Sequence, residues 1–348
     1  MQRNWDIFCR VIDNYGDIGV CWRLARQLAK EYGLNVRLWV DEPASLSLMC
    51  QGFDGALASQ FLEGVEVIRW LDAFPEVMPA DVVIEAFACE LPGNYLNLMA
   101  LAEKAPCWIN LEYLTAENWA ESCHGLASPH PSLPLVKQFF FPGFTPGTGG
   151  LIRESDLLAR RNAFVKEMPA KNCMEISLFC YESAPVGELI NLLADYPLPV
   201  LLHLPPGKPY AAVVACLGGS GPWQLGQLCI LPMPFLDQDE YDQLLWRCDL
   251  NFVRGEDSFV RAQWAGQPFI WQIYEQDADA HLAKLNAFLE RYTEGIPAPD
   301  AAAIRSVFIA WNTGLGLKEA WHEFMHQHTK IANHAEKWST KLSETPDL

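Results

Sequence analysis

The chain has 348 residues, of which 50% are hydrophobic and 20% charged, a composition typical of a folded globular protein with room for two domains. Its 43 acidic and 25 basic residues give a formal net charge of −18. So acidic a surface repels phosphate backbones, which argues against nucleic-acid binding and requires that any bound phosphate be held by a local arrangement of residues.

The cysteines and the N-terminus indicate the compartment. The 11 cysteines are scattered, none forms a C-x-x-C pair, and most lie within apolar runs. This distribution favours reduced, buried thiols over a disulfide framework. Met1–Asp6 lack the basic and apolar regions of a signal peptide, and no apolar run reaches the ~18 residues that a membrane span needs. We therefore expect a cytoplasmic protein with no membrane partner.

The first half of the chain alternates strand-like and helix-like segments. Its expected strands are Trp5–Ile12, Asn35–Val40, Val65–Trp70, Asp81–Phe87 and Pro106–Glu112. A helix is expected over Val20–Tyr32, because apolar residues recur there at helical spacing. Strands that alternate with helices predict a parallel sheet covered on both faces.

The same alternation resumes after a segment rich in proline and glycine at Phe139–Gly150 and an arginine-containing helix over residues 154–167. The expected strands are Met174–Tyr181, Leu198–Leu204, Leu228–Leu231, Asp249–Val253 and Pro268–Tyr274, with a helix over Asp237–Arg247. The tail, residues 301–341, is helical in composition. Two such arrays predict an α/β protein with two Rossmann-type halves.

The most informative stretch of the second half is the loop Arg254–Ser258. It follows the strand that ends at Val253 and precedes a helix-like pattern, and ligands of open α/β sheets bind at the carboxyl ends of strands. Asp257 and Ser258 are expected to cap that helix, whose first N–H groups would face an anion, and Arg254 can grip phosphate. A well-capped surface helix with an incidental charge cluster is the alternative interpretation.

Two acids occupy the first loop, DNYGDIG, where a dinucleotide-binding fold keeps its glycine fingerprint and where Asp41 would be the ribose-binding acid. The glycines are spaced G-x-x-G, however, and Asp13 and Asp17 would repel a pyrophosphate, so an NAD-dependent oxidoreductase is the weaker alternative. Two carboxylates here suit cation binding or activation of a nucleophile. Helix capping by an aspartate explains either acid singly but not the pair.

A zinc-hydrolase pattern, H-E-x-x-H, occurs at His322–His326. We interpret it as a coincidence, because little chain follows it and no H-x-x-G-x-x-H extension exists. The histidines here are expected to mark a solvated helix face, and no metal site is predicted.

Aromatic residues accompany the Arg254 loop. Phe179 and Tyr181 are two residues apart near the end of a strand, so their side chains face the same way. Phe235 and Tyr241 come from a neighbouring loop and helix. Most aromatic residues pack in the protein core, which is the alternative interpretation of these four. Aromatic rings beside a phosphate-binding arginine would, however, form a nucleotide pocket.

Three segments carry a family resemblance. DNYGDIGVxWRLARQL near the start, Phe179–Glu182, and the block from Pro234 to Gln276 together resemble the EarP family of bacterial protein-arginine rhamnosyltransferases, over nearly the whole chain. The resemblance implies a GT-B glycosyltransferase fold, with two facing Rossmann-like domains and an active site in the cleft between them. Residues 1–168 would form the acceptor side and residues 169–348 the nucleotide-sugar side, with C-terminal helices packing back on the first domain.

The resemblance also implies an activity. The implied activity is the transfer of L-rhamnose from dTDP-β-L-rhamnose to one arginine of translation elongation factor P. The implied transfer inverts the anomeric carbon and needs neither a metal ion nor a cofactor. The donor pocket would contain Phe179, Tyr181, Phe235, Gln238, Tyr241, Arg254, Glu256, Asp257 and Ser258, and the acceptor side the pair Asp13 and Asp17. A non-catalytic nucleotide-sugar-binding or protein-binding module is the alternative, and it would bind the donor without turnover.

The residues suit the implied chemistry. An arginine side chain stays protonated at neutral pH, so its nitrogen is a poor nucleophile until a group orients it and takes its proton. We expect Asp17 to be that general base and Asp13 to hold the arginine or orient the sugar. Arg254 and the helix N-terminus would stabilise the departing diphosphate, while Glu256 and Asp257 would bind hydroxyls or fix the loop.

Overall fold

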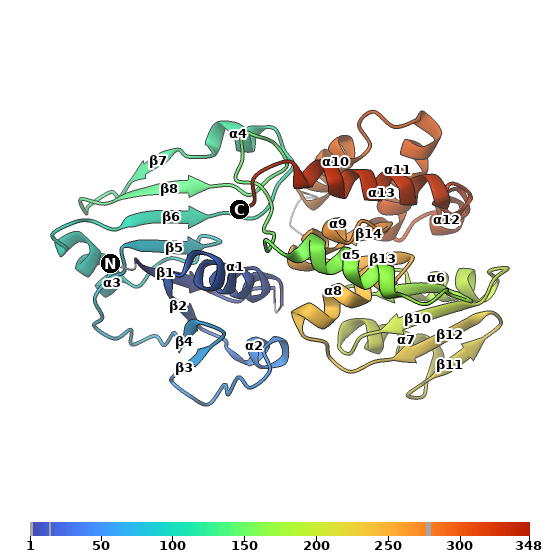
Figure 1. Cartoon of the computed structure of the whole chain (residues 1–348), viewed down its shortest axis with the longest axis horizontal. Helices are drawn as coiled ribbons and strands as arrows, with labels where there is room; N and C mark the ends of the chain where they lie inside the picture. Colours follow the sequence, from blue (N-terminus) through green and yellow to red (C-terminus); the bar gives the residue numbers. More distant parts are fainter. Residues whose placement is uncertain (1–2, 14, 276–279) are drawn as a thin grey trace. The chain divides into compact units, whose positions relative to one another are not determined.

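The computed structural model describes residues 3–13, 15–275 and 280–348, which divide into two compact units (Figure 1). The first unit runs to Ser155 and includes Thr345–Leu348, and the second comprises Asp156–Glu344. Helix α5 (Leu157–Glu167), which precedes the expected boundary at residue 168, clusters with the second unit and contacts its helix α8. Within the described residues, no helix is both long and apolar enough to cross a membrane.

The first unit contains an eight-stranded sheet of order β3-β4-β2-β1-β5-β6-β8-β7. The strands are β1 (Asn4–Cys9), β2 (Asn35–Val40), β3 (Ser59–Leu62), β4 (Val65–Arg69), β5 (Val82–Ala86), β6 (Cys107–Leu111), β7 (Ala127–Pro129) and β8 (Val136–Phe140). The helices are α1 (Gly16–Tyr32), α2 (Ala44–Met49), α3 (Gly93–Leu101) and α4 (Trp119–Cys123). The inner strands are parallel, which confirms the predicted βα pattern, and β3 and β7 pair antiparallel at the edges.

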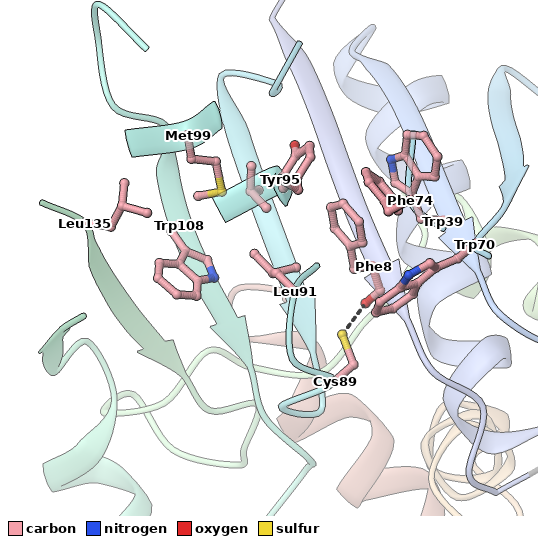
Figure 2. Close-up of a cluster of buried hydrophobic side chains, with 11 residues drawn as sticks. Phe8, Trp39, Trp70, Phe74, Cys89, Leu91, Tyr95, Met99, Trp108 and Leu135 are labelled. Carbon is pink, nitrogen blue, oxygen red and sulfur yellow. Dashed lines mark hydrogen bonds between the residues drawn. The ribbon is translucent and has the colours of Figure 1, made fainter. Parts of the chain in front are cut away.

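A cluster of buried aromatic residues holds the centre of this sheet (Figure 2). Phe8 of β1 stacks on Trp39 of β2 with ring centroids 5.8 Å apart, and meets the ring of Tyr95 from α3 edge-on at 4.9 Å. Trp70 and Phe74 pack against the same ring of Phe8. Burial of each such side chain contributes about 1.5–3 kcal/mol, so the cluster fixes β1 beside its neighbours and thereby the loop that follows it.

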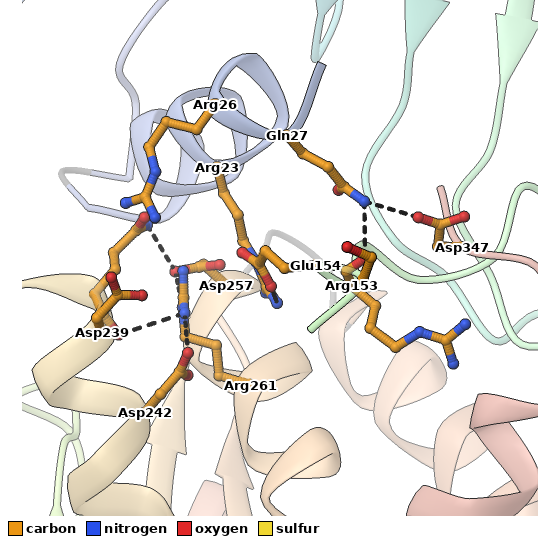
Figure 3. A network of polar contacts seen from close by, with 12 residues as sticks. Arg23, Arg26, Gln27, Arg153, Glu154, Asp239, Asp242, Asp257, Arg261 and Asp347 are labelled. Atoms are coloured by element: carbon orange, nitrogen blue, oxygen red, sulfur yellow. Dashed lines mark hydrogen bonds and ion pairs between the residues drawn. The ribbon is translucent and has the colours of Figure 1, made fainter. Parts of the chain in front are cut away.

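The C-terminal residues are tied into the first unit by polar contacts to α1 (Figure 3). Asp347 forms a parallel bridge with Leu151, and its Oδ2 accepts a hydrogen bond from Nε2 of Gln27 at 2.8 Å. Arg23, which is 1% exposed, donates to Glu154 at 2.7 Å. These contacts anchor α1, whose first turn carries Asp17.

The second unit contains a six-stranded sheet of order β11-β12-β10-β9-β13-β14. The strands are β9 (Met174–Leu178), β10 (Val200–Leu204), β11 (Trp223–Leu225), β12 (Leu228–Pro232), β13 (Leu250–Arg254) and β14 (Phe269–Gln272). All pair in parallel except β11, an antiparallel edge strand. Every strand predicted in this half is present.

The helices of the second unit are α5, α6 (Val186–Ala194), α7 (Lys208–Leu217), α8 (Gln238–Arg247), α9 (Asp257–Ala265), α10 (Ala280–Tyr292), α11 (Ala298–Thr313), α12 (Leu317–His326) and α13 (His328–Ser343). The predicted helical tail is confirmed as α11, α12 and α13. Helix α11 contacts β14 and α13 contacts α9, so the C-terminal helices cluster within this unit. All 11 cysteines are free thiols, as predicted, and six of them are buried: Cys9, Cys21, Cys50, Cys89, Cys180 and Cys248.

Candidate active site

Asp17 lies in the first turn of α1, directly after the loop that follows β1. It is 2% exposed. Its Oδ2 accepts the N–H groups of Ile12 at 2.8 Å and Asp13 at 2.9 Å, and its Oδ1 accepts the hydroxyl of Tyr113 at 3.2 Å. Burial raises the pKa of Asp17, while these hydrogen bonds oppose the rise. A buried, oriented carboxylate with a raised pKa is suited to accept a proton.

Asp13 is half-buried on the same loop, and Gly16 makes room for its carboxylate. The carbonyl of Asp13 accepts the N–H of Gly16 at 2.6 Å, which closes the turn before α1. A Cβ atom on residue 16 would lie 2.8 Å from Oδ2 of Asp13. Gly16, the first glycine of the G-x-x-G spacing, therefore leaves space for the carboxylate of Asp13. This role differs from that of a glycine that lets the backbone approach a pyrophosphate.

The loops after β5 and β6 lie at the same end of the sheet as the loop after β1, because these strands are parallel neighbours. Tyr113, after β6, stacks on Phe87, after β5, with ring centroids 4.3 Å apart and an interplanar angle of 15°. Phe87, Ala88 and Glu90 have left-handed φ angles of 55°, 53° and 54°. For residues other than glycine this backbone costs about 1–3 kcal/mol each, and such strain gathers at functional sites.

On the second unit, the guanidinium of Arg254 lies against two aromatic rings. Its Cζ is 4.5 Å from the ring centroid of Phe179 and 4.4 Å from that of Tyr181. Arg254 is 5% exposed, and among the described residues its Nε and Nη1 atoms find no hydrogen-bond partner. Cation–π contact offsets only part of the cost of burying these donors. Within the described part of the chain, two buried donors of this guanidinium are therefore unsatisfied.

The N-terminus of α9 follows Arg254, and here the predicted caps are wrong. The N-cap residue is Glu256, and no side chain within the described part of the chain makes the cap hydrogen bond. Ser258 turns back instead, so that its Oγ accepts the N–H of Arg254 at 3.1 Å and donates to the carbonyl of the same residue. The serine hydroxyl thus fixes the last residue of β13 across the short turn that joins this strand to α9.

Asp257 is engaged by a buried arginine rather than by the helix N-terminus (Figure 3). Arg261, 2% exposed, donates to Asp257 at 2.8 Å and to Asp242 of α8 at 2.9 Å. Nε2 of Gln238 donates to the same carboxylate of Asp257 at 3.3 Å. Two predicted donor-site residues, Gln238 and Asp257, are thereby held together by Arg261, which was not predicted as a site residue.

The remaining predicted residues surround this centre. Tyr241 of α8 meets the ring of Phe179 edge-on at 6.0 Å, and burial raises the pKa of its hydroxyl, which therefore stays protonated. Phe235 and Glu256 are half-buried on the loops before α8 and α9. Gln272, at the end of β14, accepts the N–H of Tyr181 at 2.7 Å.

Four residues at these two sites escaped prediction: Tyr113, Phe87, Arg261 and Gln272. Gln272 gave a detectable signal, since a glutamine inside the apolar run of β14 needs a polar partner when buried. Arg261 gave a similar one, because it lies within the mainly apolar stretch Phe259–Ala265 of a predicted helix. Tyr113 and Phe87 gave no signal in the sequence, because their contact depends on the order of strands in the sheet.

The H-E-x-x-H residues lie on α12 and have other partners. Nδ1 of His322 is 2.7 Å from the carbonyl of Lys318, and Nδ1 of His326 is 3.2 Å from Nε2 of Gln327. In the part of the chain that the structure describes, no group of three or more His, Cys, Asp or Glu side chains is placed to hold a metal ion. His322 and His326 are exposed, so both lie on a solvated face of α12, as expected.

Comparison with known proteins identifies relatives over the full chain. A family model described as elongation-factor P (EF-P) rhamnosyltransferase EarP matches residues 5–348. A protein-arginine rhamnosyltransferase of Pseudomonas putida is 47% identical, with 100% of this chain and 97% of that protein covered. A solved structure from a study of EarP-mediated arginine glycosylation of elongation factor EF-P is 33% identical, with a TM-score of 0.68 and coverage of 99% and 96%.

More distant solved structures agree in fold. The spinosyn rhamnosyltransferase SpnG, complexed with thymidine diphosphate, matches with a TM-score of 0.54, covering 99% of this chain and 97% of its own. At 13% identity this likeness concerns the fold alone. Together with the two parallel-rich sheets described above, these matches confirm the predicted GT-B fold.

Proposed function

This chain belongs to the EarP family of elongation-factor P rhamnosyltransferases, and from that premise we propose that it transfers L-rhamnose to an arginine side chain of translation elongation factor P. The proposed donor is dTDP-β-L-rhamnose, and the transfer inverts the anomeric carbon in one displacement. The names of the relatives support the rhamnosyl group and the arginine acceptor. The donor nucleotide and the inversion rest on the family resemblance and on the residues.

The observation that carries the proposal is the buried guanidinium of Arg254. Its Nε and Nη1 atoms have no hydrogen-bond acceptor among the described residues, while Phe179 and Tyr181 flank it. A diphosphate supplies oxygens that accept from a guanidinium fork, with charge-assisted hydrogen bonds about twice as strong as neutral ones. As the bond to the sugar breaks, negative charge grows on the departing diphosphate, and Arg254 and the N-terminus of α9 stabilise it. The proposal therefore needs no metal ion.

The remaining donor-site residues recognise the nucleoside and the sugar. The rings of Phe179, Tyr181, Phe235 and Tyr241 provide apolar faces for the base, each stacked face contributing about 1–3 kcal/mol. Gln238 offers an amide whose hydrogen-bond partner in the free protein is Asp257. Glu256 and Asp257 accept hydrogen bonds from hydroxyl groups of the ribose or the sugar, since as anions they would repel phosphate.

Asp17 and Asp13 bind and deprotonate the acceptor arginine. A guanidinium nitrogen forms its bond to the anomeric carbon as the bond from that carbon to the diphosphate oxygen breaks, and the nitrogen loses its proton to Asp17. Asp17 suits this role because it is buried, oriented by three hydrogen bonds, and has a raised pKa. Asp13 holds the positive charge of the incoming arginine beside it.

Mass spectrometry tests the function directly. Elongation factor P incubated with this protein and dTDP-β-L-rhamnose is expected to gain the mass of one deoxyhexose, located on one arginine by peptide fragmentation. Omission of the nucleotide sugar is the control. Calorimetric binding of the donor without any mass gain would instead indicate a binding module, and NADH binding in a fluorescence titration would favour an oxidoreductase.

A glycine substitution tests the placement of Asp13. Gly16→Ala puts a Cβ atom 2.8 Å from Oδ2 of Asp13 and must displace that carboxylate. We expect rhamnose transfer to fall about tenfold, because a misplacement near 1 Å costs up to about a hundredfold in rate. Donor affinity, measured by calorimetry, should stay unchanged.

Gly93→Ala is the matched control for this substitution. Gly93 is the first residue of α3 as Gly16 is of α1, and no described atom lies within 4 Å of the Cβ that would be added there. Transfer by Gly93→Ala should equal that of the parent protein. Equal rates for both variants would mean that the position of Asp13 does not matter to the reaction.

A further inference from the structure

The two oxygens of Asp17 differ in their surroundings. Oδ2 accepts two backbone N–H groups, from Ile12 and Asp13, which fill the two acceptor positions of a carboxylate oxygen. Within the described residues, Oδ1 accepts one hydrogen bond, from the hydroxyl of Tyr113 at 3.2 Å. Oδ1 therefore keeps one acceptor position for a proton, beside the hydrogen bond from Tyr113.

Tyr113 is itself held by a strained segment. Its ring stacks on Phe87, whose N–H donates to the carbonyl of Leu111 at 2.7 Å and thus ties the segment after β5 to the end of β6. Phe87, Ala88 and Glu90 keep left-handed backbone angles there. Left-handed backbone at three positions so close together persists only where the surrounding structure enforces it, and its location at this end of the sheet points to a role in the site.

We propose that Tyr113 is a positioning residue for Asp17, and that its hydroxyl orients Oδ1, the oxygen left to receive the proton of the acceptor nitrogen. The inference rests on the proposed function and extends it to a residue from a different strand. In the reaction the nitrogen–carbon bond forms, the bond from the anomeric carbon to the diphosphate breaks, and the proton passes to Oδ1. Tyr113 donates its hydrogen bond throughout and keeps its own proton.

The other titratable groups near Asp17 lack this role. They are Asp13 on the same loop and Cys9 at the end of β1, and Cys9 in turn interacts with Cys21 in α1 and Asp41 after β2. The backbone N–H of Asp13 lowers the pKa of Asp17, whereas the charge of the Asp13 side chain raises it. Asp41 accepts the N–H of Val11 at 3.0 Å. A hydrogen bond between its thiol and Cys21, together with burial, raises the pKa of Cys9, which stays uncharged. Among the side chains, it is the Tyr113 hydroxyl whose hydrogen bond favours the ionised form of Asp17.

The test is Tyr113→Phe, which keeps the ring on Phe87 and removes the hydroxyl. Transfer at neutral pH is expected to fall about tenfold, the effect of one lost hydrogen bond to a charged group. Because the pKa of Asp17 should rise, the acid limb of the kcat/KM profile should move to higher pH, and the loss should shrink as pH increases. Donor affinity should not change.

Tyr95→Phe is the matched control. Tyr95 also donates its hydroxyl to a buried carboxylate of the first unit, that of Asp6, and its loss should leave the pH profile superimposable on that of the parent protein. A titration of the Asp17 carboxyl carbon by NMR, assigned through Asp17→Asn, reports the same shift without any turnover. In Tyr113→Phe that resonance should titrate at higher pH.

Two outcomes would overturn the inference: a Tyr113→Phe profile parallel to that of the parent protein, or an unchanged titration of Asp17. Failure of the proposed function is distinguishable from both. In that case the parent protein would transfer no sugar, whereas here the parent protein transfers rhamnose and only the effect of Tyr113 is missing. A lower melting temperature with an unshifted profile would show a merely structural role for Tyr113 and counts against the proposal.

Discussion

Asp17→Asn is expected to abolish detectable transfer of rhamnose to arginine, a loss of at least about 10²–10⁴-fold, which is the usual contribution of a general base. The substitution is close to isosteric. An amide oxygen can still accept the N–H groups of Ile12 and Asp13, and the amide nitrogen can donate to the hydroxyl of Tyr113. What is lost is the ability to take a proton from a guanidinium. Transfer rates, measured by mass spectrometry at saturating donor, check this expectation.

The control for Asp17→Asn is Asp41→Asn. Asp41 also accepts a backbone N–H of this loop, that of Val11 at 3.0 Å, so its substitution removes a nearby charge while the loop stays supported. Transfer should stay within a few fold of that of the parent protein. Calorimetry should show the affinity for dTDP-β-L-rhamnose within a few fold in both variants. A strong loss of donor binding in Asp17→Asn would make Asp17 a donor-site residue and refute its role as base.

Arg254→Ala is expected to lower donor affinity by about 10–100-fold, because it removes a charge-assisted contact of about 1.5–3 kcal/mol. It also removes the side chain packed between Phe179 and Tyr181. Arg254→Met separates these effects, since the methionine keeps an apolar chain of similar length between the rings and lacks the charge. Both variants should bind dTDP and dTDP-β-L-rhamnose weakly in calorimetry.

The stability of Arg254→Met provides a second measurement. In the free protein Arg254 is 5% exposed and two of its nitrogens lack an acceptor among the described residues. Replacement of a buried, unsatisfied charge by an apolar side chain is neutral or stabilising. The free energy of unfolding without ligand should therefore be equal or higher in Arg254→Met, while donor affinity falls. Unchanged donor affinity, or a large loss of stability, would contradict the assignment of Arg254 to phosphate binding.

The fold could be predicted well where strands are apolar and buried on both faces. Val36, Leu38 and Val40 of β2, for example, are all nearly inaccessible, and the run Asn35–Val40 was predicted with the observed bounds. The inner strand β8, whose residues are exposed or half-buried, was not predicted. Nor were the edge strands β3, β7 and β11. They are three or four residues long and pair on one side, so their composition carries no continuous apolar run.

The site could be predicted wherever its residues follow one another along the chain. Asp13 and Asp17 lie on one loop, Phe179 and Tyr181 alternate after one strand, and Arg254 ends another, so local spacing was sufficient to single them out. The same reasoning failed for the caps of α9. Helix capping is a preference of the isolated segment. In the folded protein Asp257 instead accepts a hydrogen bond from Arg261, a buried charged residue one helical turn away.

Two βα arrays, the loops that carry the acids and the arginine, and the family of the chain could be read from local patterns, because periodicity, turn residues and motifs are properties of neighbouring residues. Which side chains contact those loops depends on how distant segments pack. Tyr113 reaches Asp17 from 96 positions along the chain. That contact exists because β5 and β6 pair next to β1, and the order of strands depends on packing between segments that no local pattern encodes.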